Sequence, residues 1–319
     1  MGYGGESIFV SMKQLVLLTL AVSALITACG GDVEAASEPT ITITATALPS
    51  PTLTATATQT PTPTPTFTIT PTPTTTRVHQ GPDTVVVPIL LYHRIDVSPF
   101  DSQYYVPPEK FEEQMKLLHD WEYTVITTET LVEAINEGAN LPPRPVIITF
   151  DDGDISVYQT AFPIMQKYGL TGVVYIVGKY MGTEGYMSSE QIKELIVAGW
   201  EVGSHSNSHY DLTKLKPEEL YTEIVWARQA LQESTGSPVL TFAYPFGEMN
   251  SGVAKKVRSA GYIAAMGLGF TSDQGKSNLY RLERRDVRGE YDIKRFAEFL
   301  PWQGDLAIIP TDTPTPIQP

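Results

Sequence analysis

The chain of 319 residues is poor in cysteine, in positive charge and in histidine. Its only cysteine is Cys29, which excludes an intrachain disulfide. Lysine and arginine number 22 against 36 acidic residues, for a formal net charge of −14, and no basic cluster stands out. Nucleic acid and anionic polymers are therefore not expected partners. With only five histidines in the chain, a place where two occur together is informative.

The chain also lacks a hydrophobic run long enough to span a membrane comfortably. Residues 12–29 instead combine one lysine, a short apolar stretch and small residues before Cys29, as in a secretory signal. The end of this segment, Ile26-Thr-Ala-Cys29, resembles a bacterial lipobox, which implies lipidation of Cys29 and stable membrane anchoring. The alternative is an ordinary signal peptide with an incidental cysteine. We therefore expect residues 1–29 to be the signal segment of an extracytoplasmic lipoprotein. Within this segment, Met12 is a better start for the signal than Met1.

Two segments are too poor in large apolar residues to build a core. Residues 30–84 are dominated by threonine and proline, and residues 310–319 repeat that composition. Such sequence cannot bury enough apolar surface to fold, and proline favours extended conformations. We expect a disordered stalk and a disordered tail on either side of a folded domain at 85–309.

Within that domain, strand-like and helix-like patterns alternate, which predicts a parallel α/β architecture, either a barrel or an incomplete one. The expected strands cover 85–95, 146–150, 172–177, 200–203, 239–243 and 262–266, and the expected helices cover 107–118, 128–137, 157–168, 188–198, 217–234 and 250–260.

The stretch around which the domain is organised is Val-Ile-Ile-Thr-Phe-Asp-Asp-Gly at 146–153. A buried strand ends there in Asp151 and Asp152, and sites of α/β folds form at such strand ends. Since side chains alternate along a strand, the two carboxylates should point in different directions. That arrangement suits one metal ligand and one free base. A simple Asp-Asp-Gly turn is the alternative.

A second strand-like segment runs into His205-Ser-Asn-Ser-His209. The serines and the asparagine favour a loop that brings both imidazoles to one ion. With a carboxylate, they form a two-histidine, one-carboxylate set with positions open to water. Two surface histidines in a polar turn are the alternative.

Together, Thr149-Phe-Asp-Asp-Gly153 and His205-Ser-Asn-Ser-His209 resemble the first two motifs of the polysaccharide deacetylases, the nodulation-protein-B type of carbohydrate esterase family 4. The resemblance covers roughly residues 85–300. It implies a distorted (β/α) barrel of about seven strands. It also implies that Asp152, His205 and His209 bind a divalent metal and that Asp151 is the general base. Zinc is the default metal, and cobalt, nickel and iron suit the same donors.

Residues 242–247, Phe-Ala-Tyr-Pro-Phe-Gly, resemble the family's third motif in the branch that includes poly-N-acetylglucosamine deacetylases. The resemblance implies that Tyr244, Pro245 and Phe246 contact substrate and that the Phe246 N–H faces the oxyanion. The family commonly has an arginine at the position of Ala243. Arg284 is a candidate substitute and substrate contact, although a solvated basic stretch explains it equally well.

The general acid is a second departure, because the chain has no histidine after His209. His93, at the end of the first expected strand, is the best replacement, since a histidine can donate a proton near neutral pH. A hydrogen-bonded structural histidine is the alternative.

These patterns predict a metal-dependent hydrolase that removes N-acetyl groups from a GlcNAc-containing glycan outside the cell membrane. The glycan could be peptidoglycan, poly-N-acetylglucosamine or a chitin-like polymer, and a monomer is expected. An O-acetyl ester hydrolase on the same scaffold and a glycan-binding lipoprotein without turnover are the alternatives.

Overall fold

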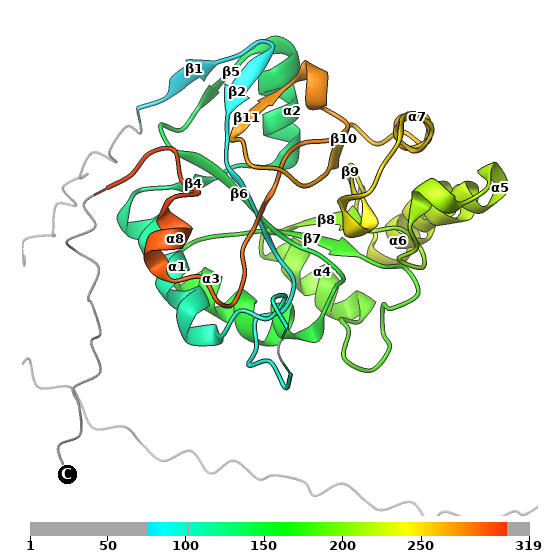
Figure 1. Cartoon of the computed structure of the whole chain (residues 1–319), viewed down its shortest axis with the longest axis horizontal. Coiled ribbons are helices and arrows are strands. Elements are labelled where there is room, and N and C mark those ends of the chain that lie inside the picture. Colours follow the sequence, from blue (N-terminus) through cyan, green and yellow to red (C-terminus); the bar gives the residue numbers. More distant parts are fainter. Residues whose placement is uncertain (1–75, 101, 305–319) are drawn as a thin grey trace, which may run out of the picture. The chain divides into compact units, whose positions relative to one another are not determined.

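The computed structural model describes residues 76–100 and 102–304 (Figure 1). Cys29, the signal segment, most of the predicted stalk and the predicted tail lie outside these residues. Regular structure begins before residue 85. β1 (Val78–Gln80) pairs antiparallel with β5 (Ala139–Leu141), and β2 (Thr84–Val86) pairs antiparallel with β11 (Asp273–Gly275). Both partners are distant in the chain, so the local threonine- and proline-rich composition did not reveal these strands.

Seven parallel strands form the main sheet and curl into a half-barrel. A short eighth strand, β4 (Thr124–Val125), pairs with β6 at one end. Beside the edge strand β10, the segment that precedes β12 is held by backbone hydrogen bonds, in which the Leu282 N–H donates to the Ala265 carbonyl and the Gly267 N–H to the Leu282 carbonyl, each at 2.8 Å. The prediction of a distorted parallel barrel is thereby confirmed. In order, the seven strands are β10 (Ala264–Met266), β9 (Thr241–Ala243), β8 (Glu201–Ser204), β7 (Val173–Ile176), β6 (Pro145–Phe150), β3 (Ile89–Tyr92) and β12 (Arg285–Asp286).

The helices follow the predicted alternation, and Figure 1 shows α1, α3 and α4 along one side of the sheet. Two of the expected helices contain a widened, π-helical stretch: η1 (Val157–Ala161) begins the first, and η3 (Tyr221–Trp226) lies inside the second. No helix in the described part of the chain is long and apolar enough to cross a bilayer. The α-helices are α1 (Pro108–Asp120), α2 (Thr128–Glu137), α3 (Phe162–Lys167), α4 (Ser189–Val197), α5 (Pro217–Leu220), α6 (Ala227–Thr235), α7 (Ser251–Ser259) and α8 (Ile293–Ala297), and the short 3₁₀ turns are η2 (Leu212–Lys214), η4 (Pro245–Gly247) and η5 (Lys276–Asn278).

The alternation of side chains along β6 divides the core and places the site. Ile148 and Phe150 pack in the larger apolar cluster with the helices, where the Phe150 and Trp200 rings stack at 5.5 Å between centroids. Ile147 belongs to a second cluster with side chains of the neighbouring strands. Asp151 continues on the side of Ile147, because residues two apart on a strand share a face.

Candidate active site

The candidate site is a cavity of about 310 Å³ at the carboxyl ends of the strands. This is the end of a parallel α/β barrel at which enzyme sites are built. All the residues expected to bind the metal, transfer protons or face the oxyanion line it, and they come from the ends of four strands. They are His93 after β3, Asp151 and Asp152 after β6, His205 and His209 after β8, and Phe246 after β9.

Asp152, His205 and His209 converge on one point. The Asp152 Oδ1 atom lies 3.4 Å from His209 Nε2 and 3.7 Å from His205 Nε2. The donor atoms of the three side chains all lie within 4.8 Å of one another. Asp152 Oδ1 is buried and has no hydrogen-bond partner among the described residues. A buried carboxylate oxygen without a partner, beside two imidazole nitrogens, fits a divalent cation.

A backbone contact fixes the ring of His205. Its Nδ1 atom lies 2.8 Å from the carbonyl oxygen of Ala243. Because a carbonyl only accepts, Nδ1 must carry the proton and donate it, which leaves the Nε2 lone pair for a metal. Ala243 therefore contributes to the site through its main chain.

The loop that carries the histidines is held in an unusual backbone conformation. His209 and Ser206 have φ angles of 58° and 65°, and the Ser206 hydroxyl accepts from the His209 N–H at 2.9 Å. The buried carboxylate of Glu223 accepts from the N–H groups of Asn207 at 3.1 Å and Ser208 at 2.8 Å. Left-handed conformations of non-glycine residues cost about 1–3 kcal/mol each and persist only where surrounding contacts impose them. Nothing in the local sequence distinguished Glu223 from the other acidic residues of its helix.

Asp151 forms a bidentate ion pair with Arg284, in which both carboxylate oxygens lie 2.7 Å from the guanidinium nitrogens. Arg284 is 1% exposed and Asp151 is 2% exposed, so the alternative of a solvated basic stretch is wrong for Arg284. Arg284 also donates to the Thr149 hydroxyl and the Gly267 carbonyl. Substrate contact was expected of this residue, but its guanidinium is engaged by the protein and holds the aspartate.

The charge pair sets the protonation of Asp151. Burial by itself would raise the pKa of the carboxyl group, but the Arg284 guanidinium, with smaller contributions from His205 and His93, lowers it to about 2. Asp151 is therefore ionised throughout the neutral range.

His93 is half-buried and packs against Tyr104, with ring centroids 4.8 Å apart. Its Nδ1 atom is buried and has no hydrogen-bond partner among the described residues. The alternative interpretation, a structural histidine held by hydrogen bonds, therefore has no support at this nitrogen. Burial lowers the pKa of His93 from its usual value, and the charges of Asp151 and Asp152 oppose this effect.

The next residue, Arg94, is a part of the site that the sequence reasoning did not identify. Its Nε donates to Asp154 at 2.9 Å, and its Nη1 lies 3.8 Å from Asp152 Oδ2. Arg94 thus lies beside the carboxylate oxygen that is not directed at the histidines. Its place directly after His93, at a strand end facing the cleft, was the signal that could have identified it.

The third motif forms one wall of the cavity. Phe246 is 60% exposed, has a φ angle of 60° and packs its ring on His209 at 4.6 Å between centroids. The Tyr244 ring lines the cavity, but its hydroxyl donates to the Tyr280 carbonyl at 2.9 Å. Pro245 is buried and lies outside the cavity lining. Of the three predicted substrate contacts, Phe246 is the one best placed to touch a ligand.

Comparison with known proteins agrees with this arrangement. The family described as polysaccharide deacetylase matches residues 138–265, which include both aspartates, both histidines and the third motif. YxkH of Bacillus subtilis is 29% identical over 202 residues, which cover 62% of this chain and 70% of that protein. Poly-beta-1,6-N-acetyl-D-glucosamine N-deacetylase of Staphylococcus aureus is 27% identical over 215 residues, 62% of this chain and 74% of the relative.

A crystal structure of a polysaccharide deacetylase from Bacillus cereus superposes with a TM-score of 0.61 at 28% identity, over 68% of this chain and 69% of the other. Sequence match, fold and the placement of the motif residues thus agree. The chain therefore carries a domain of the polysaccharide deacetylase family.

Proposed function

We propose that this protein is a metal-dependent N-deacetylase of a GlcNAc-containing glycan. The observation that carries the proposal is that one cavity holds two carboxylates in different environments. Asp152 presents to two imidazoles a buried oxygen that has no hydrogen-bond partner within residues 76–100 and 102–304, while Asp151 is kept ionised by Arg284. One suits a cation and the other suits proton transfer.

In this proposal Asp152, His205 and His209 hold the cation, with zinc as the first candidate and cobalt, nickel or iron as others. When bound, the cation supplies Lewis-acid activation of the acetyl carbonyl and of water. Ala243 and Glu223 hold the histidine ring and its loop, so that the donor set is formed before the metal arrives.

Side chains of the protein then accept and donate the protons of the reaction. Asp151 accepts a proton from the attacking water, and Arg284 fixes the orientation of its carboxylate. The Phe246 N–H is assigned to the oxyanion. His93 donates a proton to the nitrogen as the C–N bond breaks, which releases acetate and leaves an amine. Burial lowers the pKa of His93, which makes its protonated form a stronger proton donor than an ordinary imidazolium.

We favour an acetamido substrate over an O-acetyl ester because of the activity named for one relative. Poly-beta-1,6-N-acetyl-D-glucosamine N-deacetylase is 27% identical to this chain, and its name specifies removal of an N-acetyl group. An amide also needs the proton donor that His93 can supply, whereas the alkoxide leaving group of an ester depends on it less.

The test is release of free amines from chito-oligosaccharides by the purified protein, with and without added zinc, cobalt, nickel or iron. We expect metal-dependent turnover. His205→Ala and Asp152→Ala should each reduce it at least ~100-fold and lower the bound metal, because each removes one of three ligands. His119→Ala is the matched control, since that histidine is exposed on α1 and pairs with Asp120.

Full metal occupancy in both ligand variants would overturn the metal assignment. Hydrolysis of acetylated xylan without amine release would favour the esterase alternative, and binding of glycan without either product would favour the non-enzymatic one.

We also propose that the protein is anchored outside the cell membrane. Residues 12–29 and Cys29 lie outside the described residues, and their sequence is the basis for assigning an extracytoplasmic lipoprotein.

A further inference from the structure

A second cavity, of about 330 Å³, adjoins the active-site cavity and is rich in arginine. The two cavities share Asp286 and Arg288 among their lining residues, so they are contiguous. Four arginines other than Arg284 line the second cavity, which is notable in a chain of net charge −14. We call it the arginine cavity, and its four residues are Arg281, Arg285, Arg288 and Arg295.

The carboxylates near this cavity neutralise it only in part. Asp286 accepts from Arg288 Nε at 2.9 Å, and Arg295 pairs with Glu298. Glu283 uses one oxygen to accept from the backbone N–H groups of residues 270 and 271. Within residues 76–100 and 102–304, neither Arg281 nor Arg285 makes a salt bridge.

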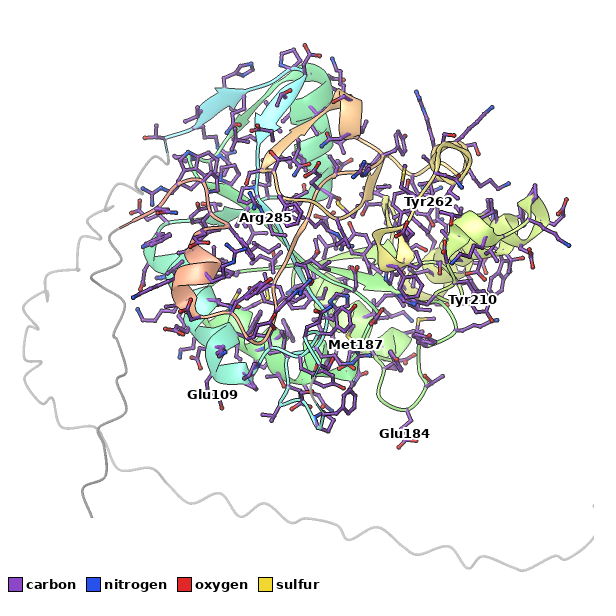
Figure 2. The ribbon with its side chains drawn as sticks, viewed as in Figure 1. Glu109, Glu184, Met187, Tyr210, Tyr262 and Arg285 are labelled. Atoms are coloured by element: carbon purple, nitrogen blue, oxygen red, sulfur yellow. The ribbon has the colours of Figure 1, made fainter. Side chains whose placement is uncertain are left out.

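Arg285 shows most clearly that an anion would fit here. Its Nε atom is buried and lacks a hydrogen-bond partner among the described residues. Its guanidinium lies 5.6 Å from the centre of the Phe299 ring, and that of Arg295 lies 5.4 Å from the same ring. Arg285 belongs to β12 and is labelled in Figure 2. Two cations on one ring repel each other, and a buried donor without an acceptor is costly unless a ligand satisfies it.

Oxyanions match this arrangement, because guanidinium groups bind carboxylates and phosphates through parallel N–H donors. We propose that the arginine cavity is a subsite for a carboxylate or phosphate substituent of the glycan whose acetamido group occupies the neighbouring active site. This inference rests on the proposed function and narrows its substrate to an acid-substituted glycan, such as one whose sugars carry a lactyl ether carboxylate.

Binding can be measured without turnover, by calorimetry on the metal-free protein. The probes are chitotetraose, which is neutral, a tetrasaccharide of alternating N-acetylglucosamine and N-acetylmuramic acid, which carries carboxylates, and inorganic phosphate. We expect the acidic tetrasaccharide to bind wild type at least ~10-fold more tightly than chitotetraose, with a difference that shrinks as salt rises. Arg285→Gln should abolish the difference without weakening the binding of chitotetraose.

Arg281→Gln is a second test variant, because its exposed side chain can be replaced with little risk to folding. It should reduce the same preference, whereas Arg258→Gln, an exposed position on α7, should not. Phosphate should compete with the acidic tetrasaccharide for wild type. If phosphate binds but the acidic sugar gains nothing over the neutral one, the cavity is a site for free anions and the glycan subsite is wrong.

The failures of the two proposals can be told apart. If metal-loaded enzyme deacetylates neutral and acidic substrates equally and Arg285→Gln changes neither rate, the subsite is wrong while the enzyme function stands. If no acetylated glycan is deacetylated, the function is wrong, and the binding measurement still decides on the subsite.

Discussion

Among single residues, Arg284 and Ala243 together account for the missing arginine of the third motif. The guanidinium that faces Asp151 comes from a residue 133 positions away in the chain. At Ala243 the main-chain carbonyl still contributes, by holding His205. The role that the family commonly gives to an arginine in the motif can therefore pass to another strand, provided that the guanidinium reaches the same carboxylate.

Replacing Arg284 by methionine should change the pH dependence of activity. In wild type the pKa of Asp151 is about 2, so this base loses no activity above pH ~4. Without the guanidinium, burial dominates and raises the pKa, and since a base must be unprotonated, kcat/KM should fall as the pH is lowered, beginning at a higher pH than in wild type. A profile of kcat/KM on chito-oligosaccharides from pH 4 to 9 measures this. An unchanged profile would show that Arg284 does not tune Asp151, and Arg258→Met is the control.

The same variant should lose stability, because it leaves a buried carboxylate unpaired at a cost of about 3–5 kcal/mol. The wild-type pair stabilises the fold above the unfolded pKa of about 3.9 and loses that contribution as the pH falls toward 2. Urea unfolding at pH 7 and at pH 3 should therefore show a smaller difference between the two proteins at the lower pH.

At the scale of elements, the π-helical stretch η3 supports the histidine loop. The N–H of Ala227 donates to the Thr222 carbonyl, five residues back, which widens the helix at this point. Glu223 lies inside this widened turn and accepts from the loop. The hydroxyl of Tyr262, labelled in Figure 2, donates to the carbonyl of Ile224 at 3.0 Å. Widened turns of this kind occur frequently at functional sites, and here the turn positions a carboxylate against the loop that carries His205 and His209.

Glu223→Ala should weaken metal binding on the order of 10- to 100-fold, the usual effect of removing a group that orients a metal ligand. It should also cost a few kcal/mol of stability, about 1–3 for each backbone N–H left without an acceptor. Glu223→Gln, which keeps one acceptor oxygen, should fall between Ala and wild type. Titration with zinc and thermal unfolding measure the two effects. Glu218→Ala, exposed on α5, is the control, and equal zinc affinity in all four proteins would contradict the role.

At the scale of the whole molecule, we propose that the folded unit and the segment before it have separate tasks, hydrolysis and anchoring. The described residues contain the barrel and both cavities, whereas the proposed anchor, Cys29, lies 47 positions before residue 76. If the threonine- and proline-rich segment is as extended as its composition predicts, it could reach about 100 Å, at ~3.1 Å per residue. The enzyme could then reach glycan at a distance from the bilayer.

Cys29→Ser should therefore release the protein from membranes. Cells that express the variant, the wild type or Ser37→Ala as a control are separated into membrane and soluble fractions, and the protein is detected in each. We expect membrane association in wild type and in the control alone, since lipidation requires the thiol. Equal membrane association of all three would contradict the lipoprotein assignment.

The sequence by itself determined the local features of this protein. Strand and helix alternation follows from the periodicity of apolar residues, and it predicted a parallel α/β architecture, either a barrel or an incomplete one. The distorted barrel of about seven strands was implied by the resemblance of the motifs to a known family. Asp151 and Asp152, and likewise His205 and His209, are close together in the sequence and directly follow predicted strands. The candidate catalytic residues were therefore expected at strand ends. Side-chain alternation then separates the two carboxylates, one toward Arg284 and one toward the histidines.

Only the tertiary structure decided which distant groups meet. Arg284 pairs with Asp151 because β12 lies two strands from β6 in the sheet, an order that no local pattern records. In the same way, Glu223 reaches the histidine loop, and the arginine cavity forms where β12 and α8 come together. Periodicity indicates whether a residue is buried, whereas strand order and register determine its neighbours. The pKa of an ionisable side chain depends on those neighbours.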